Sequence, residues 1–352
     1  MAKYVYVGAA GAPATGSGPK MQGAYRLDAA SGKWEQMAGG LPANVEVRSI
    51  RVQPSAPNIV YLGSGDGVWR SDDAGSTWKH LPLPGKDKVV WSILIHPKNP
   101  DVLLVGTEVT TVYRSENGGK SFTELKVPAP QGVVKMNFPT RVLRIAIAPQ
   151  NPDEIYVALE VGGMVRSLDG GKTWDDCNPN LLAFTEQPKY RSRIGSDTET
   201  EGMMDSHALA VSGAQPGVVF LANRMGLFRS QDRAKTWKDM EVGRFSPLTY
   251  ARDVQISPHN PNTMFAALSV AAVSDAGSLY RSDDHGETWK RFDHGVDIAS
   301  TLMTISPSPS DPKRVYCAAR RGQVFGTEDG GASWKTYQLP DGAQGIYSLA
   351  VA

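Results

Sequence analysis

The stretch Ser71-Asp72-Asp73-Ala74-Gly75-Ser76-Thr77-Trp78 decides the fold, because its pattern Ser-x-Asp-x-Gly-x-Thr-Trp recurs along the chain. In such a box the Asp side chain can accept hydrogen bonds from nearby backbone amides and fix a tight turn. The glycine adopts a positive φ without steric cost, and the tryptophan is large enough to be buried between two sheets. One match would be a weak signal, whereas six matches at regular spacing indicate a repeat protein.

Two further full copies, three variants and one eroded copy follow the same spacing. The full copies are Ser167–Trp174 and Ser282–Trp289, the variants are Ser115–Phe122, Ser230–Trp237 and Thr327–Trp334, and the eroded copy is Leu27–Trp34. Subtracting the residue numbers of the aromatic residues that end the boxes gives spacings of 44, 44, 52, 63, 52 and 45. This period is typical of a β-propeller blade.

A proline turn precedes several of the boxes. It occurs at Gln53–Tyr61, His96–Leu104, Ala148–Tyr156 and Ser257–Phe265. Each turn joins two runs of strand-forming residues, so one repeat contains four strands. In the first repeat we expect them at Val47–Val52, Ile59–Gly63, Gly67–Ser71 and Thr77–Leu81.

The two ends of the sequence complete one more repeat. Ile346–Ala352 has the pattern of a first strand, while Lys3–Gly8, Ala24–Leu27 and Lys33–Met37 have the patterns of the next three. We therefore predict an all-β fold: one seven-bladed β-propeller over residues 1–352, with four-stranded antiparallel blades, Asp-box turns and a blade shared between the N- and C-termini. The predicted blades span 46–83, 89–127, 141–178, 205–240, 250–293, 300–339, and 345–352 with 2–37.

Composition narrows the function classes. The 352 residues carry a net charge of +1, which argues against a general nucleic-acid binder. No apolar run approaches the roughly 20 residues that span a bilayer, so we expect no membrane insertion and a cytoplasmic location. We expect Cys177 and Cys317 to be reduced, partly buried thiols; a disulfide or a catalytic thiol is the alternative.

The boxes resemble the Asp-box repeats of sialidases, of xyloglucan hydrolases, of the luminal propeller of sortilin-type receptors and of a photosystem II assembly factor. This resemblance covers nearly the whole chain and implies the fold, because the box lies on a turn away from the sites where these families act. The Arg-Ile-Pro signature of sialidases, the second propeller of xyloglucan hydrolases and the Cys-rich module of sortilin-type receptors do not occur in this sequence. No catalytic residue is therefore transferred from any of these families.

Strand order predicts two different faces. Because strands alternate in direction, the proline turns and the Asp boxes share one face, here the box face. The turns between second and third strands share the other, the loop face, with the linkers between blades. We expect the ligand site at the centre of the loop face, because loops there usually carry function. Its polar residues are, in the turns, Asp66, Glu108, Glu160, Asn223, Arg224, Arg320 and Arg321, and, where inner strands start, Arg48, Trp91, Arg141, Arg144, Asp205, His207, Tyr250, Arg252 and Asp253.

Arginine is suited to bidentate binding of carboxylate or phosphate. We assign binding of a small anionic or carbohydrate-like ligand to Arg141, Arg144, Arg224, Arg252, Asp253, Arg320, Asp66, Trp91 and Tyr250, and acid–base catalysis to Glu160, His207, Asp205 and Glu108. The alternatives are a His207 bonded to a backbone carbonyl, a Glu160 or Glu108 in a salt bridge, and arginines that pair between blades. No cofactor is predicted and no metal-ligand spacing occurs, although the sequence does not exclude an ion in the channel.

These residues favour a sialidase- or glycosidase-like hydrolase, or a lyase, that acts on a small anionic or sugar-like substrate in the central funnel. The alternative is a non-catalytic protein-binding factor similar to the photosystem II assembly propeller. The long insertion 175–204 then becomes the docking loop, and in an enzyme it would be a lid.

Overall fold

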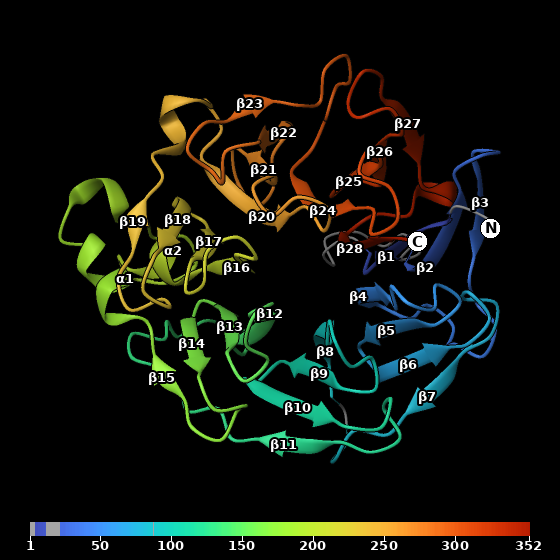
Figure 1. Ribbon diagram of the computed structural model, residues 1–352, viewed down its shortest axis with the longest axis horizontal. Coiled ribbons are helices and arrows are strands. Elements are labelled where there is room, and N and C mark those ends of the chain that lie inside the picture. Colours follow the sequence, from blue (N-terminus) through green and yellow to red (C-terminus); the bar gives the residue numbers. More distant parts are fainter. Residues whose placement is uncertain (1–3, 12–21, 87) are drawn as a thin grey trace.

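The computed structural model describes residues 4–11, 22–86 and 88–352, and these form seven four-stranded antiparallel sheets arranged in a ring (Figure 1). The prediction of a seven-bladed propeller closed by the two ends of the chain is therefore confirmed. Residues 2, 3 and 12–21 of the predicted shared blade lie outside the described residues.

Each blade runs outward from an inner strand at the channel. The seven inner strands are β4 (Val47–Val52), β8 (Val90–Ile95), β12 (Arg141–Ile147), β16 (Ser206–Val211), β20 (Tyr250–Ile256), β24 (Leu302–Pro307) and β28 (Ile346–Val351). The second strands, in the same blade order, are β5 (Val60–Ser64), β9 (Leu103–Thr107), β13 (Ile155–Glu160), β17 (Val219–Asn223), β21 (Met264–Ser269), β25 (Val315–Ala319) and β1 (Tyr4–Ala9).

The outer half of each blade is shorter. The third strands are β6 (Gly67–Ser71), β10 (Thr111–Ser115), β14 (Gly163–Ser167), β18 (Gly226–Ser230), β22 (Gly277–Ser282), β26 (Gln323–Thr327) and β2 (Gly23–Asp28). The fourth are β7 (Lys79–Leu81), β11 (Thr123–Leu125), β15 (Asp175–Asp176), β19 (Lys238–Asp239), β23 (Lys290–Arg291), β27 (Lys335–Gln338) and β3 (Lys33–Gln36). Short helices lie in the connections: α1 (Pro179–Phe184), η1 (Pro188–Tyr190), α2 (Glu201–Met204), η2 (Val242–Arg244) and η3 (Pro340–Gly342).

The Asp box is a hydrogen-bonded turn, as the sequence predicts. In the first box the Ser71 hydroxyl donates to Asp73 Oδ1 at 2.7 Å and accepts from the Gly75 amide at 2.8 Å. The other carboxylate oxygen of Asp73 accepts from the Thr77 hydroxyl at 2.6 Å. These bonds, the one from the Thr77 hydroxyl above all, lower the pKa of Asp73 to about 2.

Seven apolar clusters fill the spaces between neighbouring blades. Each contains the aromatic residue of one box; Trp78, for example, packs in one cluster with Tyr6 and Met37 of the shared blade and Ile50 of the first. The aromatic residues of the boxes therefore pack each blade against its neighbour. No helix in the described part of the chain is long and apolar enough to span a membrane.

Closure joins the C-terminal strand to the N-terminal one. β28 pairs antiparallel with β1, and Val351 lies opposite Val5. On its other side Ser348 of β28 contacts the next inner strand, because its hydroxyl oxygen accepts from the Ile50 amide at 2.9 Å. All seven inner strands thus surround one central channel (Figure 1).

Candidate functional site

Every inner strand carries a β-bulge at the same place. The pairing register shifts once in each, and one residue per strand is left without a partner on the neighbouring second strand. Bulges redirect side chains and are common next to functional sites. The seven unpaired residues are Arg48, Trp91, Leu143, His207, Arg252, Met303 and Tyr347.

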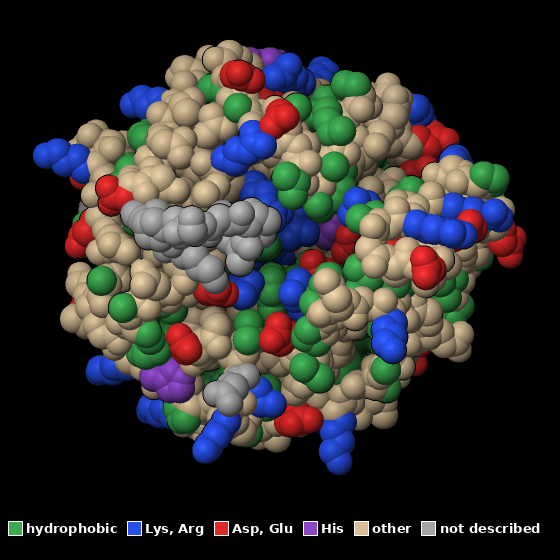
Figure 2. Space-filling view, turned by 180° about the vertical axis from the view of Figure 1, so that it is seen from behind, with side chains coloured by type: hydrophobic (Ala, Val, Ile, Leu, Met, Phe, Trp, Pro, Cys, Tyr) green, Lys and Arg blue, Asp and Glu red, His purple; other side chains and the backbone are tan. Residues whose placement is uncertain are grey.

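These seven bulge residues narrow the channel on its loop-face side. Together with Ser49, Arg51, Arg144 and Ser348 they line a cavity of about 30 Å³, here called the neck. Figure 2 shows Lys and Arg side chains gathered in the hollow at the centre of one face of the ring. Large side chains at the bulge positions, such as Trp91 and Tyr347, explain why so little space remains here.

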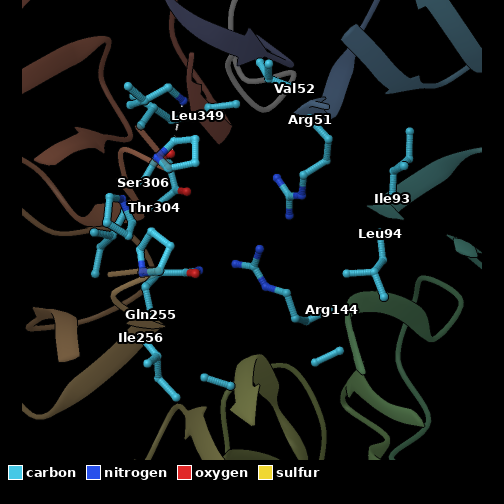
Figure 3. Close-up of a pocket in the computed structure, with 18 of the residues that line it drawn as sticks. Arg51, Val52, Ile93, Leu94, Arg144, Gln255, Ile256, Thr304, Ser306 and Leu349 are labelled. Atoms are coloured by element: carbon cyan, nitrogen blue, oxygen red, sulfur yellow. Dashed lines mark hydrogen bonds between the residues drawn. The ribbon is translucent and has the colours of Figure 1, made fainter. Parts of the chain in front are cut away.

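The channel widens towards the box face into a cavity of about 380 Å³, here called the vestibule. Ala146, Ala210 and Ala350 contribute to its wall, and Pro258 and Pro309 of the proline turns stand at its rim. Figure 3 shows Arg51 and Arg144 pointing into this cavity and towards each other. The larger cavity therefore opens on the box face, whereas the sequence analysis places the ligand site at the centre of the loop face.

Polar groups reach the vestibule from both sides. Gln255, Thr304 and Ser306 lie on the wall opposite Arg51 and Arg144 (Figure 3). The remaining wall is apolar, and two of its residues are Leu94 and Ile256. A cavity of this size with few polar groups among apolar walls is typical of a small-molecule site.

One buried ion pair bridges the channel between neck and vestibule. Arg144 of β12 reaches past β16 to Asp253 of β20, with Nη2 and Oδ1 at 3.0 Å. The Asp253 side chain is fully buried and also accepts from the Ile305 amide at 2.8 Å and from the Gln255 side-chain amide at 2.9 Å. Both oxygens of the carboxylate are thus held in place by donors.

Arg51 has a different environment. It donates to the Ile50 carbonyl at 2.8 Å and the Ser348 hydroxyl at 3.2 Å, and it forms no ion pair within the described residues. Burial, with the neighbouring Arg144 cation, lowers the pKa of Arg51 to about 9. An anion placed beside this guanidinium would therefore be stabilised.

The predicted residues Arg141, Glu160, Glu108 and Trp91 come together at the start of β12. Arg141 Nη1 lies 2.7 Å from Glu160 Oε2, and its Nε lies 3.9 Å from Glu108 Oε2. The Trp91 ring lies below two guanidinium carbons, 4.2 Å from that of Arg48 and 4.4 Å from that of Arg141. Trp91 is only 5% exposed, so its ring is not a platform for a sugar.

A second cluster of predicted residues surrounds His207, whose side chain is 1% exposed. His207 Nδ1 lies 2.8 Å from the Ala251 carbonyl oxygen, so this nitrogen donates. Its Nε2 lies 3.2 Å from both the Tyr250 hydroxyl and Asp205 Oδ2. His207 therefore makes the backbone-carbonyl hydrogen bond that was the structural alternative to a catalytic role, and it also lies beside a carboxylate.

The charges around Asp205 favour its ionised form. Burial raises the pKa of Asp205, but His207, Arg252 and Arg224 together lower it by more, so the net pKa lies below its usual value. Burial also raises the pKa of Tyr250 to about 12. At neutral pH this cluster therefore holds a carboxylate and a phenol, both in their ordinary charge states.

The other predicted residues are dispersed. Arg252 lines the neck and makes no hydrogen bond or ion pair within the described residues. Arg320 donates to the Ala272 carbonyl at 3.1 Å, and Asp66 is exposed in the β5–β6 turn, where its carbonyl faces His80. Both lie outside the walls of the neck and the vestibule.

Two residues that line the vestibule, Arg51 and Gln255, are not among the site residues predicted from the sequence. Arg51 lies three positions after the bulge residue Arg48, and Gln255 lies three positions after the bulge residue Arg252. In a regular strand, residues three positions apart point to opposite sides of the sheet, so the sequence pattern alone would not place both members of a pair in the channel. The available signal was a charged or amide residue deep within an inner strand, where an apolar residue is usual.

The insertion 175–204 folds over the third and fourth blades. Its two helices, α1 and α2, contact each other, and the buried Glu201 carboxylate accepts from the Ile194 amide at 3.0 Å and the Ser196 amide at 2.9 Å. Ile194 itself is about half exposed. The insertion is therefore an ordered loop with an apolar side chain at its surface.

Both cysteines are buried and free. Burial raises the pKa of the Cys177 thiol to about 12, which disfavours the thiolate that a nucleophile needs. Among the described side chains, no group of three or more His, Cys, Asp and Glu residues is placed to hold a metal ion.

Curated relatives of this chain include xyloglucan-degrading enzymes. A probable oligoxyloglucan-reducing end-specific xyloglucanase of Neosartorya fischeri is 24% identical in an alignment 315 residues long that covers 76% of this chain and 37% of the relative. The xyloglucanase Xgh74A of Acetivibrio thermocellus is 26% identical in an alignment 299 residues long that covers 78% of this chain and 29% of the relative. The chain thus spans about a third of the length of these relatives.

Solved structures with the same fold include two kinds of protein. The GH74 xyloglucanase from Xanthomonas campestris has a TM-score of 0.66 at 16% identity, covering 100% of this chain and 52% of that one. YCF48 from Cyanidioschyzon merolae has a TM-score of 0.57 at 15% identity, covering 86% of this chain and 88% of that one. At these identities the likeness shows the fold alone.

Family models match on both halves of the chain. The Sortilin-Vps10 model, described as sortilin, neurotensin receptor 3, matches residues 66–184 and 277–351, which together exceed half of the chain. The BNR-Asp box repeat model matches residues 227–240. The chain therefore belongs to the Sortilin-Vps10 family, as a seven-bladed propeller built from Asp-box repeats.

Proposed function

We propose that this propeller binds a small anionic or carbohydrate-like molecule in the vestibule. The observation that carries the proposal is the pair Arg51 and Arg144, which project into a cavity of about 380 Å³; among the described residues, Arg144 pairs with a carboxylate and Arg51 does not. The guanidinium groups would bind a carboxylate, sulfate or phosphate group. Gln255 and Ser306, on the facing wall, would bind hydroxyl groups of the same molecule.

Isothermal titration calorimetry tests this proposal with D-glucuronate, sulfate and uncharged D-glucose. We expect binding of glucuronate and weaker or no binding of glucose. Arg51→Met removes the unpaired charge and Ala210→Phe fills the cavity, so each variant should lose glucuronate binding. Arg114→Met is the matched control, because Arg114 pairs with Glu116 on an outer strand far from the channel. Wild-type protein that binds none of the anions would refute the proposal.

A second candidate function is hydrolysis of a glycoside at the loop face. It is favoured by the xyloglucanase relatives and by two carboxylates, Glu108 and Glu160, that flank the Arg141 guanidinium within 4.0 Å. In this reading Glu160 is the nucleophile or base, and the Asp205–His207 pair exchanges protons with substrate. Arg224 and Arg252 are near enough to Asp205 to lower its pKa and to favour a charged substrate.

Release of reducing ends from xyloglucan oligosaccharides measures this activity. If the assignment is right, Glu160→Gln and His207→Gln each reduce turnover at least a hundredfold, since general acid–base catalysis contributes about 10²–10⁴-fold. Glu116→Gln, on an exposed turn, should leave it unchanged. Full activity in both channel variants would remove these residues from the mechanism.

A solved structure of the same fold, YCF48 bound to D1 peptide, favours a third candidate, a protein partner that docks on the 175–204 loop. Ile194 offers an exposed apolar contact on a loop fixed by Glu201. Ile194→Asp should abolish capture of a host protein that the wild-type chain retains, whereas Val270→Asp, at a more exposed valine in a different blade, should not. Equal capture by both variants would move the partner away from this loop.

A further inference from the structure

The neck has a charge pattern distinct from that of the vestibule. Its lining includes four arginines, Arg48, Arg51, Arg144 and Arg252, together with His207, and contains neither Asp nor Glu. Two of the four have carboxylate partners outside the neck: Arg48 pairs with Glu46, and Arg144 pairs with Asp253. Arg51 and Arg252 have none within ion-pair distance in the described structure, so positive charge is left in excess.

Hydrogen-bond donors in the neck are also left without acceptors. The Nε groups of Arg48 and Arg144 are buried and have no partner among the described residues. Arg252 makes no hydrogen bond there, although Glu160 and Asp205 act on its charge from beyond ion-pair distance. A buried donor without an acceptor costs about 1–3 kcal/mol, and more when it is charged, so such groups in native proteins usually have a partner.

The size of the neck limits what that partner can be. Its volume of about 30 Å³ suits one water molecule or one monatomic anion of similar size. A water molecule could accept from two of the donors but would not offset the charge of Arg51 and Arg252. A halide does both, because a spherical anion accepts from donors in every direction.

We propose that the neck is a specific site for a single monatomic anion, which would be chloride in a cell, held by the guanidinium groups of Arg48, Arg51, Arg144 and Arg252. The anion fixes these four side chains against one another at the level of the bulges. It occupies the neck and leaves the vestibule open, but it shares Arg51 and Arg144 with the ligand proposed above, so the two anions would compete for these guanidinium groups.

Bromide replaces chloride and is visible by anomalous scattering. Crystals of the full chain, grown without chloride and soaked in sodium bromide, should show an anomalous peak in the neck within hydrogen-bond distance of Arg252. Density there without an anomalous signal would mean water and would overturn the proposal, as would bromide only on the outer surface. A neck peak together with no glucuronate binding would contradict the proposed function alone.

Chloride-35 NMR tests the same site in solution. Binding broadens the chloride line, and bromide titrated into the sample should reverse the broadening. Arg252→Met should weaken the apparent affinity at least about tenfold, the usual worth of one charge-assisted hydrogen bond. Arg48→Met serves as a second variant if Arg252→Met fails to fold, and Arg114→Met should match wild type. Equal line widths for wild type and a folded neck variant would overturn the proposal.

Discussion

Asp253→Asn tests how the channel manages its charge. The carboxylate faces four hydrogen-bond donors: Oδ1 accepts from Arg144, from the Val254 amide and from the Gln255 side chain, while Oδ2 accepts from the Ile305 amide. Asparagine has the same shape but replaces one oxygen with an NH₂ group. At least one donor must then face another donor, and Arg144 loses the only carboxylate with which it pairs in the described structure.

The expected cost follows from burial. Asp253 is fully buried and the Arg144 side chain is 18% exposed, so water replaces little of what is lost. Removing one partner of a buried ion pair costs about 3–5 kcal/mol, which includes the penalty for the charge that remains. For a protein whose free energy of unfolding is typically about 5–15 kcal/mol, this is a large fraction of the total.

Urea unfolding followed by circular dichroism measures the loss. Asp72→Asn is the matched control, because Asp72 pairs with Arg70 at 2.7 Å but its side chain is half exposed. Surface pairs of that kind contribute about 0–1 kcal/mol. If Asp253→Asn loses no more than Asp72→Asn, the channel does not depend on this carboxylate and the reasoning about its charges is refuted.

Three further predictions concern the scaffold. Trp78→Ala should lower the free energy of unfolding by about 3–5 kcal/mol in urea unfolding, because Trp78 is buried between two blades. A loss under about 1 kcal/mol would mean that the box aromatics do not stabilise the contact between blades. Ser348→Ala should cost about 1–3 kcal/mol by the same measurement, since it leaves the buried Ile50 amide without its acceptor; no change would mean that closure does not need this bond. Hydrogen bonds, chiefly from the threonine hydroxyls, lower the pKa values of Asp73 and Asp169 to about 2, below the ordinary value of 3.8, so their contribution to stability is present above about pH 4 and is lost as pH falls to 2. The Tm should fall over that interval, and a Tm constant from pH 4 to pH 2 would contradict this.

The blades could be predicted from the sequence because each one carries its own local chemistry. The box marks the position in the sequence where the third strand ends and the turn to the fourth begins. The hydrogen bonds that fix this turn join residues within one stretch of eight, as in Ser71–Trp78. The pairing of β28 with β1 could be predicted for a different reason. The C-terminal segment has the pattern of a first strand and the N-terminal segment has the patterns of the next three, so together they complete one blade.

The channel could be predicted only in part. Arg144, His207 and Arg252 were assigned to its mouth from strand order, and they line the neck. The bulges were not predicted, because a one-residue shift in strand pairing leaves no mark in a single sequence. In β4 the shift changes the regular alternation of side chains, so Arg48 and Arg51 do not point to opposite sides as they would in a regular strand. The location of the larger cavity also depended on the bulges, because they fill one end of the channel with large side chains.

The most direct test of the central claim, that unpaired guanidinium groups make the channel an anion site, is a crystal structure of the chain with D-glucuronate. The account predicts difference density in the vestibule with the carboxylate group beside Arg51 and Arg144 and the sugar hydroxyls towards Gln255. Density for the ligand only elsewhere, or an unchanged vestibule at a ligand concentration that saturates binding in solution, would contradict it.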